Sequence, residues 1–332
     1  MDGPSHPSSS KEMESPIEVQ QENELVHLQD QRILTTEQVE SWRNKGFCVV
    51  EAKSADDNAL SGWFMTAKEA ERFRYAARVS VLGDGKKIKP LPDLKNFGGL
   101  GFPFLSRYSQ SLNDLALHPR ITQGVRELLG LAQNEVPLLS QAECWVKRDA
   151  DANPNLPMEF VNTDQRMHCD YPNHYLTHPP PWDQPEAVAM IVYLDDGEEC
   201  GGPTAYVSRE GETDEAYAYP YVHMPGVGDI PWLNDRTCAE AYLKENHPAS
   251  NEFRKKLYER EQYVRYKVGT VLIYRLDLWH RGTPLHPNKD RAVVNLLFKR
   301  SEAKHITSWH RGWAVSFRRD ANHRGINFCS TQ

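Results

Sequence analysis

Hydrophobic and polar positions divide the chain into a mainly helical first part and a strand-rich second part. After Leu34, apolar residues at helical spacing follow a possible cap at Thr35 or Thr36, and Gly46 is expected to end that helix. Helical periodicity returns over residues 61–79 and 113–131. Strands are expected at residues 47–50, 138–146, 165–170, 187–194, 204–207, 262–268, 270–274 and 291–299.

The order of these segments predicts the architecture. Helices followed by a run of short strands indicate an α+β fold, in which flanking helices support one β sandwich or barrel. Residues 1–33 are rich in Ser, Pro, Glu and Gln, so they bury too little apolar surface to offset the entropy of ordering, and we expect a disordered N-terminal tail. Residues 34–332 are expected to form one domain. Within it, residues 208–261 form a long polar insertion, and segments of this length are usually lids, binding elements or partly helical.

Composition and charge exclude several classes of protein. The net charge of −7 over 332 residues argues against a nucleic-acid partner, because such proteins need a basic face. No two of the six cysteines have the close spacing of a zinc knuckle or a redox pair. We see no signal peptide, no transmembrane helix and no C-terminal peroxisomal signal in Ser330-Thr331-Gln332. A soluble cytoplasmic protein with no membrane partner is therefore expected.

The first element with chemical meaning is the triplet His168-x-Asp170. In a strand, residues i and i+2 point to the same face, so this imidazole and this carboxylate can occupy two adjacent positions on a metal ion. Alone the triplet is weak evidence, because chance gives about one in a chain of this composition. His280, which follows the apolar run 271–274, would complete the two-histidine-one-carboxylate triad of non-haem Fe(II) oxygenases. A hydrogen-bonded core histidine is the alternative for this residue.

A buried arginine is the second element. Strand alternation places Arg291 on the same face as Val293, toward the interior of the predicted barrel. A guanidinium in that position is costly unless an anion pairs with it. The far carboxylate of 2-oxoglutarate would be such a partner, because guanidinium binds carboxylate through two parallel hydrogen bonds. An ordinary ion pair with Asp277 or Asp290 is the alternative.

Together these motifs resemble the phytanoyl-CoA dioxygenase family. The resemblance rests on the His168-x-Asp170 triplet, on the run Trp279-His280-Arg281-Gly282, and on Arg291 eleven residues past the second histidine. It extends to the strand turn Cys200-Gly201-Gly202-Pro203-Thr204 and to the N-terminal helix and strand, and so covers about residues 34–300. It implies a double-stranded β-helix (jelly-roll) core that uses Fe(II), 2-oxoglutarate and O2.

By the same resemblance, individual residues receive roles. His168, Asp170 and His280 would be the metal ligands, and they would carry the catalysis. The residues that would bind 2-oxoglutarate are Arg291, Gln141 and Thr204. One departure is Gly282, which lacks the hydroxyl that some members use on 2-oxoglutarate. The contacts around the cosubstrate are therefore less well defined than the metal triad.

The function that the resemblance implies is oxidation by a dioxygenase. It would hydroxylate or otherwise oxidise a C–H bond of a small-molecule or acyl substrate, such as an acyl-CoA, and release succinate and CO2. Relatives that halogenate have Gly or Ala at the position of Asp170, so the carboxylate favours hydroxylation. A basic excess over residues 291–324 could receive an anionic substrate or form a solvated surface. A non-catalytic or 2-oxoglutarate-independent cupin-like metal-binding protein stays open as the alternative.

Overall fold

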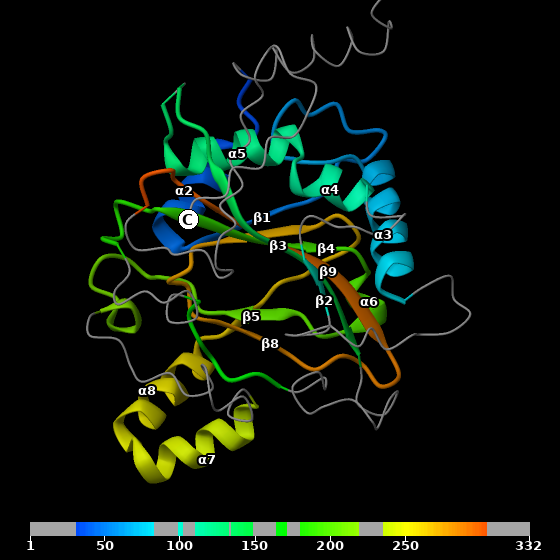
Figure 1. Cartoon of the computed structure of the whole chain (residues 1–332). Coiled ribbons are helices and arrows are strands. Elements are labelled where there is room, and N and C mark those ends of the chain that lie inside the picture. The colour runs from blue at the N-terminus through cyan, green and yellow to red at the C-terminus, as the bar shows by residue number, and fades with distance from the viewer. Residues whose placement is uncertain are drawn as a thin grey trace, which may run out of the picture.

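Helices surround two antiparallel β-sheets in the computed structural model of the chain (Figure 1). It describes residues 31–82, 99–101, 110–132, 134–148, 164–170, 180–218 and 235–303. The described helices are α2 (Thr36–Lys45), α3 (Ala67–Leu82), α4 (Gln110–Ala116), α5 (Pro119–Leu129), α6 (Gly197–Cys200), the 3-10 helix η4 (Glu215–Tyr217), α7 (Arg236–Asn246) and α8 (Pro248–Glu259). The described strands are β1 (Phe47–Val50), β2 (Gly99–Gly101), β3 (Leu138–Arg148), β4 (Ala187–Tyr193), β5 (Thr204–Tyr206), β6 (Gln262–Tyr263), β7 (Val271–Tyr274), β8 (His280–Gly282) and β9 (Asp290–Lys299).

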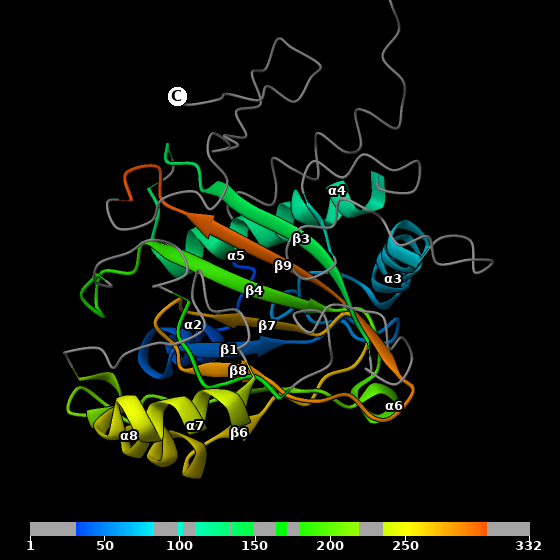
Figure 2. The same cartoon turned by 60° about the horizontal axis from the view of Figure 1, so that its bottom comes forward.

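The two sheets have the strand order of a jelly roll. The larger sheet runs β1-β7-β4-β9-β3-β2, and the smaller one runs β6-β5-β8. Figure 2 shows the strands of the larger sheet side by side, with β8 next to them in the other layer. In Figure 1, α2, α4 and α5 lie on one side of the larger sheet, whereas α7 and α8 lie beyond the smaller sheet. The predicted α+β fold with a double-stranded β-helix core is confirmed.

Strand β9 explains why the larger sheet is buried on both faces. Ala292, Val294, Leu296 and Phe298 belong to the hydrophobic cluster that the helices cover, and Val293 and Leu297 belong to a second cluster on the opposite face. This alternation follows from the two-residue period of a strand. Fully burying one such large side chain contributes about 1.5–3 kcal/mol. The opposite face of β9 therefore looks into the barrel, as the sequence predicted for Arg291.

The N-terminal helix forms where the sequence placed it. Thr35 and Gln38 make a reciprocal capping box at its start, and Gly46 ends it in the left-handed conformation, with φ of 93°. One boundary differs from the prediction. Ile33 was assigned to the tail but is fully buried, and Glu127 of α5 accepts the backbone N–H groups of Ile33 and Leu34 at 2.7 and 3.0 Å. These buried contacts include Ile33 in the packed domain, and the tail residues 1–30 lie outside the described residues.

Several predicted elements are divided or shortened. The helix expected over 113–131 is split into α4 and α5, because Pro119 lacks an amide hydrogen and occupies the first turn of the second helix. Residues 165–170 make isolated bridges at Gln165 and His168 instead of a regular strand. The strand expected over 262–268 is limited to Gln262–Tyr263. The three-residue strands β2 and β8 were not expected, because such short runs carry no recognisable alternation.

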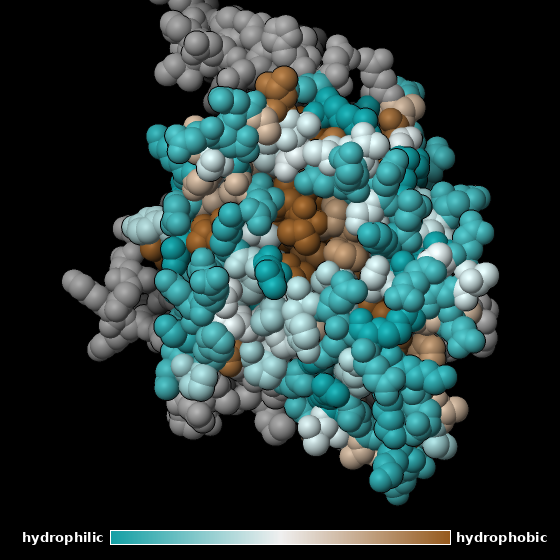
Figure 3. All heavy atoms as spheres, turned by 180° about the vertical axis from the view of Figure 1, so that it is seen from behind, coloured by the Kyte–Doolittle hydropathy of each residue, from teal (hydrophilic) through white to brown (hydrophobic). Residues whose placement is uncertain are grey.

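The long insertion is partly helical. Within residues 208–261, the structure describes η4, α7 and α8, while residues 219–234 lie outside the described part. Figure 3 shows the face opposite to Figure 1, which is mostly hydrophilic around a hollow with hydrophobic residues on its floor. Over the described ranges, no helix is long and apolar enough to span a membrane.

Candidate metal site and its surroundings

His168, Asp170 and His280 converge on one point of the barrel. Their ligand atoms all lie within 4.8 Å of one another, so one metal ion can contact all three side chains. The Oδ1 atom of Asp170 is 3.8 Å from Nε2 of His168 and 3.6 Å from Nε2 of His280. Two imidazoles and one carboxylate in this arrangement are a donor set that non-haem Fe(II) favours, with coordination positions left open. The residues present therefore fit the metal that the sequence implied.

Backbone hydrogen bonds explain how ligands so distant in sequence meet. The N–H of His168 donates to the carbonyl of His280 at 2.9 Å, and the N–H of His280 donates back to the carbonyl of His168 at 2.8 Å. The N–H of Asp170 donates to the carbonyl of Leu276 at 2.9 Å. The 164–170 segment is thereby attached to the edge of β8, which fixes the spacing between the two histidines.

Each histidine ring is oriented by a carbonyl two residues before it. Nδ1 of His168 lies 3.0 Å from the carbonyl of Arg166, and Nδ1 of His280 lies 2.9 Å from the carbonyl of Leu278. A carbonyl only accepts, so each Nδ1 carries the hydrogen and each Nε2 keeps its lone pair. This is the way metal-binding histidines are usually fixed by groups outside the metal shell.

The protonation states of the site suit metal binding. Burial lowers the pKa of His168 to about 3, and His280 and Arg166 add to this effect, so the imidazole is neutral at physiological pH. The hydroxyl of Tyr274 donates to Oδ2 of Asp170 at 2.9 Å. Burial, followed by the charge of Asp170, raises the pKa of Tyr274 well above its usual value, so this hydroxyl stays a donor. Tyr274 thus forms a hydrogen bond with Oδ2 of Asp170, while Oδ1 faces the two histidines.

Arg291 is buried deeper in the barrel, with 6% of its surface exposed. One of its terminal nitrogens donates to the carbonyl of Gly202, and its guanidinium carbon lies 5.6 Å and 5.9 Å from the ring centres of Tyr193 and Tyr266. Its Nε has no hydrogen-bond partner among the described residues. A buried cation with an unpaired hydrogen-bond donor is stabilised when an anion binds next to it, so this position suits an anion-binding site.

The alternative ion pairs proposed for this arginine do not form. Asp277 pairs with Arg275 at 2.8 Å. Asp290 pairs with Arg78 of α3 at 2.9 Å, on the outer side of the sheet. Both carboxylates therefore have other partners, and the guanidinium of Arg291 stays inside the barrel.

The two other predicted cosubstrate residues lie in different places. Thr204 is buried near Arg291, and its hydroxyl oxygen accepts from the hydroxyl of Tyr193 at 2.7 Å. Gln141 pairs with Leu297 of β9, whereas Arg291 pairs six residues further along β3. At about 3.3 Å per residue, that separation is about 20 Å. The structure therefore brings Thr204 toward Arg291 but leaves Gln141 at the other end of the strand.

Sequence reasoning missed two residues of this region. Lys147 is the direct partner of Arg291 on β3, and its ammonium donates to the carbonyl of Thr283 at 2.7 Å. Tyr274, described above, is the second. Strand alternation from Trp145 would have placed Lys147 on the interior face, but the pairing of β3 with β9 is not visible in a single sequence. For Tyr274, no local pattern distinguishes a ligand-supporting tyrosine from a core tyrosine.

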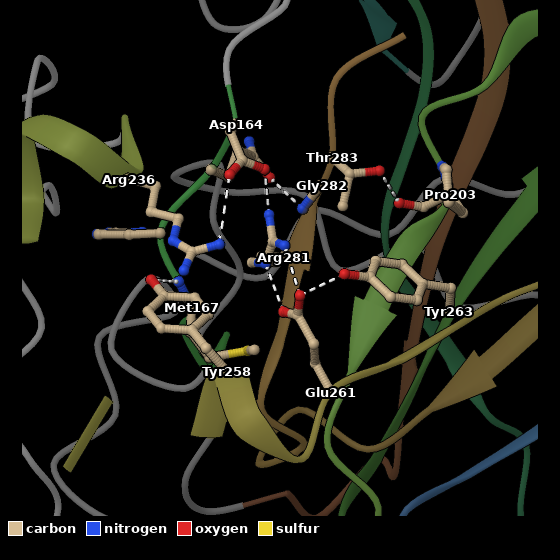
Figure 4. Close-up of polar contacts among 12 residues, drawn as sticks. Asp164, Met167, Pro203, Arg236, Tyr258, Glu261, Tyr263, Arg281, Gly282 and Thr283 are labelled. Atoms are coloured by element: carbon tan, nitrogen blue, oxygen red, sulfur yellow. Dashed lines mark hydrogen bonds and ion pairs between the residues drawn. The ribbon is translucent and has the colours of Figure 1, made fainter. Parts of the chain in front are cut away.

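A network of ion pairs, shown in Figure 4, includes residues next in sequence to the metal ligands. Arg281 follows His280 in β8, so strand alternation turns its side chain to the opposite face, where only 3% of its surface is exposed. Its Nε and one terminal nitrogen donate to the two carboxylate oxygens of Glu261, each at 2.8 Å, and the other terminal nitrogen contacts Asp164. Arg236 of α7 also reaches Asp164, at 3.7 Å. The network therefore joins β8, the 164–170 segment and the helical insertion.

Tyr258 of α8 extends this network to the other histidine-bearing segment. Its hydroxyl accepts the backbone N–H of Met167 at 3.1 Å, one residue before His168. The guanidinium carbon of Arg236 lies 3.7 Å from the centre of the Tyr258 ring. Figure 4 shows Tyr258 and Glu261 pointing toward the two segments from the same side. We call the set Asp164, Arg236, Tyr258, Glu261 and Arg281 the brace.

The fold and the site together define a class of protein. A double-stranded β-helix that presents two histidines and one carboxylate to a single point is the arrangement of non-haem iron oxygenases. The chain belongs to the phytanoyl-CoA dioxygenase family, whose family model matches residues 42–293. Enzymes of this family use Fe(II), 2-oxoglutarate and O2, and membership places the chain among the Fe(II)- and 2-oxoglutarate-dependent oxygenases.

Solved structures of other proteins share the fold. One is EctD from S. alaskensis with bound Fe, which is 17% identical, with a TM-score of 0.51 over 83% of this chain and 80% of that chain. Another is the epimerase SnoN in complex with Fe3+, alpha ketoglutarate and nogalamycin RO, which is 16% identical, with a TM-score of 0.50 over 82% of this chain and 86% of that chain. No curated protein matches the chain.

Proposed function

We propose that the chain couples the decarboxylation of 2-oxoglutarate to the oxidation of a C–H bond in a small-molecule or acyl substrate. The observation that carries the proposal is the convergence of His168, Asp170 and His280, with both Nε2 lone pairs turned toward the carboxylate. When bound, iron, 2-oxoglutarate and O2 supply the oxidising power, and succinate and CO2 are released. The protein residues hold, orient and enclose the reactants.

In this proposal each residue has a defined part. The two imidazoles and Oδ1 of Asp170 hold the metal, and Tyr274 fixes the orientation of the carboxylate. Arg291 receives the far carboxylate of 2-oxoglutarate, with Thr204 in the wall next to it. Apolar side chains of β7 and β9 line the barrel and exclude water from the reacting atoms.

The location of Gln141 differs from the one predicted next to Arg291. Its partner Leu297 also pairs with Ala189, and Ala189 pairs with Tyr274, so Gln141 shares a cross-strand row with the residue that supports Asp170. We propose that it lies at the level of the metal ligands. Asp170 itself favours hydroxylation, or a related oxidation, over halogenation.

We further propose that one catalytic domain carries the activity. It includes the buried Ile33 and the helical insertion whose brace supports the metal ligands. Arg300 is one of the basic residues proposed to receive an anionic substrate. Its guanidinium donates to the carbonyl of Leu129. Most of the basic stretch lies beyond residue 303, outside the described residues.

Succinate release across a substrate panel tests the proposed function. The panel pairs acyl-CoA thioesters with the corresponding free acids and adds small polar metabolites, all in the presence of Fe(II), 2-oxoglutarate and O2. We expect at least one compound to raise succinate release above the substrate-free rate. Asp170→Ala should abolish the increase, while His286→Ala, which changes an exposed histidine, should keep it.

Two outcomes would favour the alternatives. A protein that binds metal but releases no succinate with any member of the panel would be a non-catalytic metal-binding protein. An enzyme that forms product without 2-oxoglutarate, and whose activity survives Arg291→Ala, would be a 2-oxoglutarate-independent oxygenase.

A further inference from the structure

Two basic side chains meet at one position inside the barrel. Lys147 of β3 and Arg291 of β9 are direct partners in the antiparallel register. Because Arg291 is inside the barrel with only 6% of its surface exposed, its cross-strand neighbour points into the same space. The two residues come from adjacent strands of the larger sheet, so the position of both is fixed by regular backbone hydrogen bonds.

The two cations converge on the same pair of backbone turns. The ammonium of Lys147 donates to the carbonyl of Thr283 at 2.7 Å, and a terminal nitrogen of Arg291 donates to the carbonyl of Gly202. These two turns are in contact, since the Thr283 carbonyl oxygen lies 3.3 Å from where a Cβ on Gly202 would stand. Both side chains thus reach one small volume from the same face of the larger sheet.

Gly282 borders that volume next to the ammonium. A Cβ at this position would lie 3.7 Å from Nζ of Lys147 and 2.7 Å from Oε1 of Gln165. The same Gln165 oxygen accepts the backbone N–H of Gly282 at 2.8 Å. A side chain at position 282 would therefore displace Gln165 and would lie in contact with Lys147.

Placing two positive charges together in a buried site is unfavourable until an anion joins them. Burial lowers the pKa of Lys147 to about 7, and the charge of Arg291 contributes to the same shift, while Asp164 opposes it. A dicarboxylate whose far end reached this volume would remove the repulsion and would satisfy the open Nε of Arg291.

We propose that Lys147 is a second cationic contact for the far carboxylate of 2-oxoglutarate, which it grips together with Arg291. The inference rests on the proposed function and adds a specificity-determining residue to it. The two contacts select a 2-oxo acid that carries a second carboxylate over one that ends in a methyl group. The purely structural alternative is that Lys147 only ties β3 to the turn at Thr283.

Binding of two 2-oxo acids distinguishes these possibilities. The metal-loaded protein is titrated without O2, once with 2-oxoglutarate and once with 2-oxopentanoate, which has the same chelating end but no far carboxylate. In Lys147→Met, we expect the Kd for 2-oxoglutarate to rise about 10- to 100-fold, the range for losing one hydrogen bond to a charged group. The Kd for 2-oxopentanoate should stay the same. Lys267→Met, which removes an exposed lysine paired with Glu51, is the matched control and should change neither value.

Each result has a defined meaning. Unchanged 2-oxoglutarate affinity in Lys147→Met would overturn the proposal, and so would equal weakening of both 2-oxo acids. A wild-type protein that binds metal but neither 2-oxo acid would instead overturn the proposed function. The melting temperature of the cosubstrate-free variant gives an independent readout: removal of a repulsive charge should keep or raise it, whereas loss of a purely structural tie should lower it. If Lys147→Met does not fold, Lys147→Gln, which keeps a donor without the charge, takes its place in the same titrations.

Discussion

At the scale of single residues, the site depends on the different partners of the two carboxylate oxygens of Asp170. One oxygen faces both imidazoles, and the other accepts the hydroxyl of Tyr274. This division holds the carboxylate plane in place before metal arrives, so less ordering is needed on binding. The motif itself was visible in the sequence, because the two-residue period of a strand joins His168 to Asp170. The partner that orients the carboxylate was not visible, since it comes from a different strand.

Tyr274→Phe should weaken metal binding while leaving the fold intact. The substitution removes only the hydroxyl that orients Asp170, and loss of such a supporting group typically costs about 10- to 100-fold in metal affinity. Titration with Mn(II), followed by electron paramagnetic resonance, measures the change. Tyr206→Phe on β5 is the matched control, because its hydroxyl contacts Gln262 and not the metal ligands. Equal affinity in wild type and Tyr274→Phe would show that the hydroxyl does not position the carboxylate.

The affinity for 2-oxoglutarate should fall as pH rises above about 7. In the free protein, burial and Arg291 hold the pKa of Lys147 at about 7, and a bound carboxylate raises it, so binding above that pH takes up a proton. Linkage of one proton gives a loss of up to about tenfold per pH unit. Of the charged groups that face Lys147, Arg291 and Arg281 lower its pKa and Asp164 raises it. Isothermal titration calorimetry in buffers of increasing pH should show the slope in wild type, and a slope that persists in Lys147→Met would contradict this assignment.

At the scale of elements, the helical insertion supports both metal-bearing segments. Tyr258 of α8 holds the backbone next to His168, and Glu261 holds the side chain next to His280. The sequence indicated a long polar insertion and allowed it to be partly helical. It gave no sign of a brace, because Arg281, Asp164 and Glu261 come from three separate segments, and each one alone looks like an ordinary surface charge.

Glu261→Gln should loosen the brace and weaken metal binding together. Gln keeps the shape of the side chain but removes the charge, which leaves the buried guanidinium of Arg281 with fewer ionic contacts. Hydrogen bonds to charged groups contribute about 1.5–3 kcal/mol, so the free energy of unfolding should fall by about this amount. Urea denaturation and Mn(II) titration measure the two effects. Glu252→Gln, which changes an exposed α8 residue paired with Lys255, should alter neither, and a loss of stability without loss of metal affinity would show that the brace is only structural.

At the scale of the whole molecule, metal binding should stabilise the fold. The ligands come from two segments that the native structure alone brings together, so the metal binds the folded state in preference to the unfolded chain. At about 100 times its Kd, a metal ion should add about 2.7 kcal/mol to the free energy of unfolding. Differential scanning calorimetry with Mn(II) measures the gain. His280→Ala should lose it and His286→Ala should keep it, and an equal gain in both variants would place the metal elsewhere.

Hydrophobic patterning predicted the class of fold, but it did not predict the pairing of strands. Alternation located β3, β4, β7 and β9 to within one or two residues at most ends, and the capping box located α2. The order β7-β4-β9-β3 joins strands that are far apart in the chain, and no local pattern encodes which strands become neighbours. Residues that depend on that order, such as Lys147 and Tyr274, therefore became visible only in three dimensions.

The central claim is that His168, Asp170 and His280 bind one iron ion that 2-oxoglutarate approaches from the side of Arg291. Crystals grown without O2 in the presence of Fe(II) and 2-oxoglutarate test it directly, by anomalous diffraction at the iron edge. We predict one anomalous peak bonded to both Nε2 atoms and to Oδ1 of Asp170, with the far carboxylate of 2-oxoglutarate against the guanidinium of Arg291. An iron peak at any other position, or a guanidinium that faces bulk water, would contradict the account.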